Sequence, residues 1–189
     1  MFKYVVGLLA LLVPSVASPQ SNIPLHSVVA LEGGAGVVVA PGIVLTANHV
    51  LKGQEALKAD EPNDLALIKK DGGVPITLPV EQPSVGSEVV IVGCPIGQCL
   101  TITRGYITKM DDGEHMVVSA TGYPGNSGGP CLWYSSLRRE WVLVGIVQSV
   151  AYTGNMFSRN IVPSVTFVKS KMDILEGVVK RKKLEDSWR

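Results

Sequence analysis

The chain is a succession of short apolar segments separated by glycine, proline and polar turn residues. Some segments alternate apolar and polar side chains, as residues 117–120 do, and others are continuous apolar runs typical of buried strands. This pattern predicts an all-β fold, with strands near residues 26–32, 35–40, 43–48, 55–58, 65–69, 76–80, 88–93, 101–109, 115–121, 129–134, 141–150 and 161–167. Residues 79–86 are the predicted crossover between the two halves of this series.

Composition agrees with many short strands joined by turns, because the chain has 20 glycines and 12 prolines and only 17% charged residues. With 189 residues it has the size of one domain or of two small fused barrels. A formal net charge of +1 argues against nucleic acid as a principal partner.

The end of the chain departs from the β pattern. Residues 170–182 have helical periodicity, with Met172, Leu175, Val178 and Val179 on one face, and we expect this helix to pack on the second half of the strands. The basic cluster at residues 180–183 suits a solvated helix end, where cations complement the helix dipole.

Residues 121–130 (TGYPGNSGGP) surround Ser127 with glycines. Glycines there allow tight, positive-φ geometry in which backbone N–H groups point outward. Outward N–H groups beside an exposed hydroxyl are what an oxyanion hole requires. A plain β-turn is the alternative interpretation of such a Gly/Pro/Asn-rich stretch.

Two upstream segments favour the catalytic interpretation. Residues 43–50 (IVLTANHV) run as an apolar strand into His49, and residues 63–69 (NDLALIK) place Asp64 directly before another strand. With Ser127 they give the chain order His, Asp, Ser, each beside a strand end. An imidazole that a carboxylate orients can take the proton of a serine hydroxyl and make it nucleophilic.

In these three motifs the sequence resembles the chymotrypsin-type (trypsin-like) serine proteases over most of residues 26–170. Residues 60–68 (DEPNDLALI), 93–97 (GCPIG) and 101–107 (TITRGYI) are similar to segments of the HtrA-type proteases within that family. The resemblance implies two six-stranded-type antiparallel β-barrels, at about residues 26–80 and 88–168, within a protease domain spanning residues 18–170. Residues 171–189 would form the C-terminal helix and basic tail.

The resemblance also implies the role of each site residue. His49 would be the general base, Asp64 the residue that orients it and Ser127 the nucleophile, while the N–H groups of Gly125 and Ser127 would hold the oxyanion. Asp60 and Glu61 are rival acids close to Asp64, which is favoured because it directly precedes a strand.

Two features depart from the family pattern. His49 and Asp64 are 15 positions apart, which leaves room for a short helical turn and one strand, so a trimmed first barrel is expected. Such trimming suits a small bacterial, phage or viral protease. HtrA-type proteases carry a peptide-binding PDZ domain after the protease domain, and the expectation here is a protease domain without one.

The resemblance places the substrate pocket along two segments. Thr121 stands six positions before Ser127 and is not an acid, so cleavage after Arg or Lys is not expected. Val150 stands where trypsin-like enzymes often keep a glycine, and its branched side chain predicts small or medium apolar residues before the cleaved bond. The predicted substrate-binding residues are Thr121, Gly122, Tyr123, Val147, Gln148, Ser149 and Val150.

The first 17 residues have the pattern of an export signal. Lys3 precedes an apolar run broken by Pro14, and Ala17 ends a small-residue cleavage pattern. The apolar run is shorter than the ~20 residues that a membrane span needs. We therefore expect a secreted or periplasmic protein, in contact with a membrane only if this segment is retained as an anchor.

Cys94 and Cys99 are close enough to bridge across a loop in an oxidising compartment, which would leave Cys131 as a small buried side chain. The pairing of three cysteines stays open on sequence alone. No Cys/His spacing resembles a zinc site, so no metal or other cofactor is expected.

The sequence therefore predicts a serine endopeptidase that acts on proteins or peptides through an acyl-enzyme. One alternative is a viral or phage-type protease of the same fold that processes a polyprotein. Another is a trypsin-fold pseudoenzyme that binds peptides without cutting them. The sequence predicts no oligomeric state.

Overall fold

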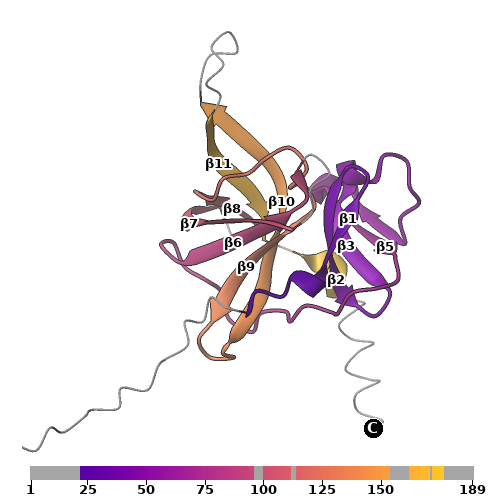
Figure 1. Cartoon of the computed structure of the whole chain (residues 1–189), viewed down its shortest axis with the longest axis horizontal. Coiled ribbons are helices and arrows are strands. Elements are labelled where there is room, and N and C mark those ends of the chain that lie inside the picture. The colour runs from indigo at the N-terminus through magenta and orange to yellow at the C-terminus, as the bar shows by residue number, and fades with distance from the viewer. Residues whose placement is uncertain (1–21, 96–99, 112–113, 154–161, 171, 177–189) are drawn as a thin grey trace, which may run out of the picture.

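The computed structural model describes residues 22–95, 100–111, 114–153, 162–170 and 172–176 (Figure 1). The fold is mostly β, as predicted, and it has two halves that lie side by side. The first half is an open antiparallel sheet, and the second is a closed barrel.

The first half contains five strands in the order β1-β2-β3-β5-β4. They are β1 (Val28–Leu31), β2 (Gly34–Ala40), β3 (Ile43–Ala47), β4 (Lys58–Asp60) and β5 (Leu65–Lys69). Every residue of β2 is buried, which explains its continuous run of small and β-branched side chains. Gly42, at a φ of +69°, makes the tight turn from β2 into β3.

The second half is a closed six-stranded barrel in the order β10-β11-β8-β7-β6-β9. Its strands are β6 (Glu88–Gly93), β7 (Thr101–Asp111), β8 (His115–Val118), β9 (Pro130–Ser135), β10 (Glu140–Thr153) and β11 (Val162–Lys169). The long strand β10 pairs with β9 along residues 140–146 and with β11 along residues 146–153. Because one end of β10 pairs with β9 and the other with β11, this strand links those two strands in the closed barrel.

One hydrophobic core joins the halves. Its buried side chains come from the sheet and from the barrel, among them Val37, Leu45, Leu67, Val90, Leu143 and Ile146. The N–H of Leu143 on β10 also donates to the carbonyl of Thr77, in the segment between the halves, at 2.9 Å. The two halves therefore share apolar packing as well as backbone hydrogen bonds.

Two predicted strands of the first half differ from the structure. The prediction of a strand at 76–80 is wrong, since these residues contribute a single isolated bridge, between Thr77 and Val142. Pro75 and Pro79 lack the N–H groups that a paired strand would need. The strand predicted at 55–58 begins later, at Lys58–Asp60, after a turn with positive φ at Lys52 and Gly53.

The predicted C-terminal helix lies mostly outside the described residues, and so do Val178 and Val179. Its described part contains a 3-10 turn, η6 (Asp173–Leu175), which contacts β4 and β5 of the sheet. The prediction that this segment packs on the barrel half is therefore wrong for the described part. Ile174 and Leu175 are buried in the shared core.

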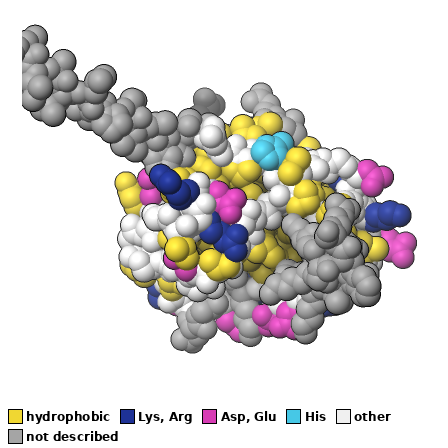
Figure 2. Space-filling view, turned by 90° about the horizontal axis from the view of Figure 1, so that it is seen from below, with side chains coloured by type: hydrophobic (Ala, Val, Ile, Leu, Met, Phe, Trp, Pro, Cys, Tyr) yellow, Lys and Arg dark blue, Asp and Glu magenta, His cyan; other side chains and the backbone are white. Residues whose placement is uncertain are grey.

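The predicted export signal at residues 1–17 also lies outside the described residues. Among the residues that are described, no helix has the length and apolar character needed to cross a membrane. Figure 2 shows acidic and basic side chains interspersed among apolar ones on one face of the molecule, in keeping with a net charge of +1.

Candidate active site

His49 lies in a 3-10 turn, η3 (Asn48–Leu51), that follows directly from β3. The Asp64 carboxylate holds this residue at two points. One carboxylate oxygen, Oδ1, accepts the backbone N–H of His49 at 2.9 Å, and the other, Oδ2, lies 2.7 Å from Nδ1 of the ring. The N–H of Asn48 donates in addition to the Asp64 carbonyl at 3.0 Å. The imidazole is thereby fixed in place and orientation, with Nε2 on the side away from the carboxylate.

Asp64 ends a second 3-10 turn, η4 (Glu61–Asn63), in the left-handed conformation with a φ of +50°. Aspartate tolerates this region better than most residues. The Asp64 N–H donates to the Glu61 carbonyl at 3.0 Å, which closes the turn. We call residues 60–64 the acid turn, because it presents this carboxylate to His49.

The rival acids of the acid turn are differently placed. Both carboxylate oxygens of Asp60 accept from Nδ2 of Asn63, at 3.0 and 2.8 Å, so Asp60 braces the turn. Glu61 is exposed. Asp64 is thus the acid of this turn that contacts His49.

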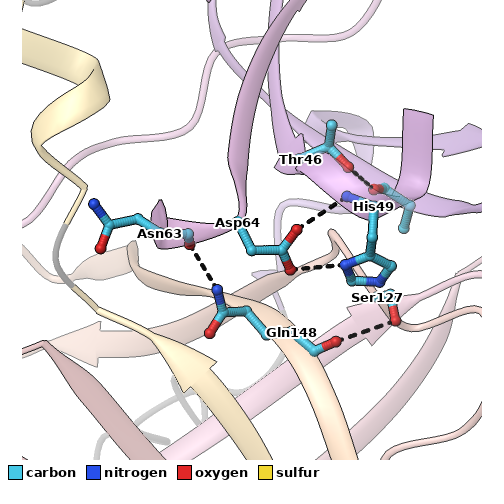
Figure 3. Close-up of polar contacts among 7 residues, drawn as sticks. Thr46, His49, Asn63, Asp64, Ser127 and Gln148 are labelled. Atoms are coloured by element: carbon cyan, nitrogen blue, oxygen red, sulfur yellow. Dashed lines mark hydrogen bonds and ion pairs between the residues drawn. The ribbon is translucent and has the colours of Figure 1, made fainter. Parts of the chain in front are cut away.

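Ser127 lies in the loop between β8 and β9, which we call the nucleophile turn (residues 123–129). The first sheet holds this turn, since the N–H of Ala35 on β2 donates to the Ser127 carbonyl at 2.9 Å. The barrel holds it too, through the N–H of Gly128 to the Val147 carbonyl at 2.8 Å. Figure 3 shows the imidazole of His49 between the Asp64 carboxylate and Ser127. The Ser127 hydroxyl lies 3.5 Å from the carbonyl oxygen of Gln148, a long hydrogen bond.

Gly125 has a φ of +99°, which requires glycine, and a Cβ there would lie 2.6 Å from the Cys94 carbonyl oxygen. Within the described part of the chain, the N–H groups of Gly125 and Ser127 donate to no backbone carbonyl.

The two predicted substrate-binding segments meet. A Cβ on Gly122 would lie 2.4 Å from Cγ1 of Val150, so the Val150 side chain occupies the space above Gly122. Of the remaining predicted residues, Tyr123 and Ser149 are exposed, Thr121 and Gln148 are half-buried, and Val147 is buried in the barrel core.

Strand β10 leaves part of one edge open beside these residues. Its pairing with β9 stops at Ile146, while its pairing with β11 continues to Thr153. Val147 still bonds Gly128 and Gly129 of the nucleophile turn. From Ser149 onward, no described strand pairs with that edge.

Sequence reasoning missed three side chains near the site. Thr166 on β11 is buried, and its hydroxyl donates to the Ala120 carbonyl at 2.7 Å and lies 2.6 Å from where a Cβ on Gly122 would be. The hydroxyl of Thr46 on β3 donates to the Ala35 carbonyl at 2.7 Å, beside Gly128. The side-chain amide of Asn63 donates to the Asp60 carboxylate within the acid turn. Their roles depend on strand register and on contacts between distant segments, for which the sequence carries no local signal.

Cys131 is fully buried at the start of β9, and burial raises the pKa of its thiol to about 12. It is a free cysteine. Cys94 is buried, while its predicted partner Cys99 lies outside the described residues. No cluster of three or more His, Cys, Asp or Glu side chains suited to a metal ion occurs in the described residues.

Comparison with known proteins gives concordant findings. Residues 54–146 match the family model of the trypsin-like peptidase domain. The magnetosome formation protease MamE of Paramagnetospirillum magneticum is 28% identical over 179 residues, covering 77% of this chain and 24% of MamE. MamE of Magnetospirillum gryphiswaldense is 30% identical over 154 residues, covering 65% of this chain and 19% of MamE. The chain therefore spans a quarter or less of the length of these relatives.

Solved structures share the fold. Rv3671c from M. tuberculosis, in an inactive form, superposes with a TM-score of 0.64 at 21% identity, covering 83% of this chain and 87% of that one. The HtrA-type protease AlgW, bound to a decapeptide, gives a TM-score of 0.60 at 21% identity, covering 78% of this chain and 52% of AlgW.

Proposed function

We propose that this chain, of which residues 54–146 match the family model of the trypsin-like peptidase domain, is a serine endopeptidase with Ser127 as its nucleophile. The observation that carries the proposal is the pair of hydrogen bonds between Asp64 and His49. The Asp64 carboxylate contacts both the backbone N–H and the ring Nδ1 of His49. A carboxylate at Nδ1 keeps the proton on that nitrogen and leaves Nε2 free to accept another.

In the proposed reaction, Nε2 of His49 takes the hydroxyl proton of Ser127 while Oγ attacks the scissile carbonyl carbon. The tetrahedral intermediate collapses to an acyl-enzyme as His49 gives that proton to the leaving amine. Water then repeats the sequence on the ester and releases the acid product. Asp64 stays ionised throughout and stabilises the imidazolium.

The N–H groups of Gly125 and Ser127 would stabilise the negative charge on the intermediate. Removing one such donor costs about 2.7–4 kcal/mol of transition-state stabilisation in a serine protease where this was measured. The N–H groups of Gly125 and Ser127 have no backbone acceptor among the described residues, which supports this role.

We propose that substrates bind as extended peptides along the open edge of β10, from Ser149 onward. AlgW is a protein of the same fold that was solved with a decapeptide, which supports peptide substrates here. Because Val150 fills the space above Gly122, the pocket for the residue before the cleaved bond would accept small or medium apolar side chains.

We also propose that the protein acts outside the cytoplasm, on the basis of the export pattern in residues 1–17. Expression of the full chain in a bacterial host, followed by N-terminal sequencing of the exported protein, tests this. A new N-terminus after Ala17 is expected, whereas an intact protein retained in the cytoplasm would contradict export.

A fluorophosphonate probe tests the chemistry, because it reacts with activated serines and needs no known substrate. The folded parent should be labelled stoichiometrically at Ser127, and the Ser127→Ala and His49→Ala variants should not be labelled. Equal labelling of the parent and Ser127→Ala would remove Ser127 from the mechanism. A folded parent that takes up no probe would instead favour a pseudoenzyme that only binds peptides.

A further inference from the structure

Gln148 forms hydrogen bonds with both Ser127 and the acid turn. It lies on β10, where its backbone carbonyl is the acceptor 3.5 Å from the Ser127 hydroxyl. Its side chain points away from that carbonyl, and Nε2 donates to the carbonyl of Asn63 in the acid turn at 2.7 Å. Figure 3 shows Gln148 reaching from the strand beside Ser127 toward the residue that precedes Asp64.

The acceptor of this bond belongs to the peptide unit that joins Asn63 to Asp64. Its oxygen accepts from Gln148, and its N–H donates to the Glu61 carbonyl at 3.0 Å. Because a peptide unit is planar, hydrogen bonds at both ends fix the orientation of the whole plane. The direction of the Asp64 carboxylate follows from that plane through φ, which stands at the uncommon value of +50°.

The Gln148 bond also crosses between the two halves of the molecule. His49 and Asp64 lie in turns of the first half, while Ser127 lies in the loop between β8 and β9 of the barrel. The side chain of Gln148 therefore links the position of Asp64 to β10, the same strand whose carbonyl at Gln148 accepts from the Ser127 hydroxyl.

We propose that Gln148 is a positioning residue, whose side chain holds the Asn63–Asp64 peptide so that the carboxylate stays in register with His49 and Ser127. This inference rests on the proposed function of the three residues. It assigns the Gln148 side chain to the acid turn and not to a substrate side chain.

The two roles predict different kinetics. A positioning residue acts on the chemical step, so its loss lowers kcat and leaves KM close to the parent value. A side chain that only contacts substrate would raise KM with kcat unchanged. Misplacement of a reacting group by about 1 Å can cost on the order of 100-fold in rate.

The test compares Gln148→Met, which keeps length and volume but has no donor, with Gln148→Glu, whose ionised carboxylate repels the Asn63 carbonyl. Thr108→Ala is the matched control, because it also removes one bond from a side chain to a backbone carbonyl, at 2.9 Å, but between β7 and β8 of the barrel. Fluorophosphonate labelling should slow about 10- to 100-fold in both Gln148 variants and remain at the parent rate in the control. Cleavage of a fluorogenic peptide with an apolar residue before the scissile bond should show the loss in kcat.

A spectroscopic readout needs no turnover. In a Ser127→Ala background, the far-downfield proton resonance of the His49 Nδ1–H bond should be present with Gln148 and broadened or shifted in Gln148→Met. An unchanged resonance together with an unchanged labelling rate, or a loss confined to KM, would overturn the positioning role while leaving the proposed function intact. Absence of labelling in the folded parent would remove the proposed function, and this inference would fall with it.

Discussion

Asp64 combines an uncommon backbone conformation with two hydrogen bonds from its carboxylate to one residue. Aspartate and asparagine both tolerate positive φ, so Asp64→Asn should keep the acid turn folded. The substitution replaces the carboxylate that fixes the His49 tautomer with an amide. We therefore expect kcat to fall about 10⁴-fold with little change in melting temperature. Labelling rates and thermal melts measure both.

Glu61→Gln is the control for this prediction, because it removes the charge of an exposed rival acid from the same turn. It should keep the parent labelling rate. A loss in Glu61→Gln comparable with that in Asp64→Asn would show that the net charge of the turn, and not the contact with His49, carries the effect.

Cys131 makes stability depend on alkaline pH. Its pKa is raised from 9.0 to about 12 in the folded state by burial, so the folded protein keeps the thiol protonated where the unfolded chain ionises. The associated stability is complete below pH 9 and is lost as the pH rises toward 12, by about 1.4 kcal/mol per pH unit. Urea unfolding at several pH values should show this extra decline in the parent relative to Cys131→Ala. Parallel curves for the two proteins would contradict it.

At the residue scale, the sequence indicated the contacts that lie within motifs and missed those that depend on register. His49 and Asp64 each stand beside an apolar strand that is recognisable from the local sequence. The contact between them was therefore predictable. The hydrogen bond from Gln148 to Asn63 spans 85 positions and two halves of the fold, and no local pattern encodes it.

The contact between β2 and the nucleophile turn belongs to the scale of elements. A Cβ on Gly34 would lie 2.4 Å from the Ser127 carbonyl oxygen, which is backbone and cannot move aside cheaply. Gly34→Ala should therefore displace the nucleophile turn and reduce labelling at least tenfold in protein that is still folded. Gly53→Ala is the control for backbone strain alone, since Gly53 has a φ of +89° but a Cβ there meets nothing within 4 Å, and the folded variant should keep the parent labelling rate. Equal labelling of Gly34→Ala and the parent would contradict this coupling.

The side chain of Val150 on β10 sets the proposed specificity. Val150→Gly should open the space above Gly122 and raise kcat/KM for a substrate with Phe before the cleaved bond, relative to one with Ala, about tenfold or more. Val150→Thr keeps the branched shape and should retain the parent preference. A peptide library measures both, and dominant cleavage after Lys or Arg by the parent would contradict the apolar pocket itself.

Strand identity was predictable where turn residues bound an apolar run, as at Glu88–Gly93. It was not predictable at 76–80, where Ile76 and Leu78 have the alternation of a strand but prolines interrupt the backbone donors. Ile76 is buried in the shared core all the same, so its apolar side chain indicated burial correctly and pairing wrongly.

The shared core makes the whole molecule one cooperative unit. Leu143 is fully buried in that core, and Leu143→Ala should lower the free energy of unfolding by about 2–5 kcal/mol. Far-UV circular dichroism, which reports both halves, and the fluorescence of Trp133 and Trp141, which lie on β9 and β10, should shift together. Leu137→Ala, at a side chain that is 72% exposed, should leave the transition in place. Two separate transitions would contradict a common core.

At this scale the sequence predicted an all-β molecule with two halves, because each predicted strand carries its own local signal. It could not predict the strand order β1-β2-β3-β5-β4 of the first sheet, since that order depends on which strands pair. Nor could it predict the contact of η6 with that sheet, where Ile174 and Leu175 are buried in the shared core.

Closure of the barrel by β10 and β11 also has a consequence for timing on the ribosome. His49, Asp64 and Ser127 emerge in that order, yet the acceptor on Gln148 and the strand that closes the barrel are translated afterwards. The roughly 40 residues between Ser127 and the end of β11 take a few seconds to synthesise at ~5–20 residues per second. During that interval the nascent chain holds the three residues of the proposed triad without the strands that complete the barrel. Under the proposed function, we expect the nascent chain to be inactive until β11 has formed.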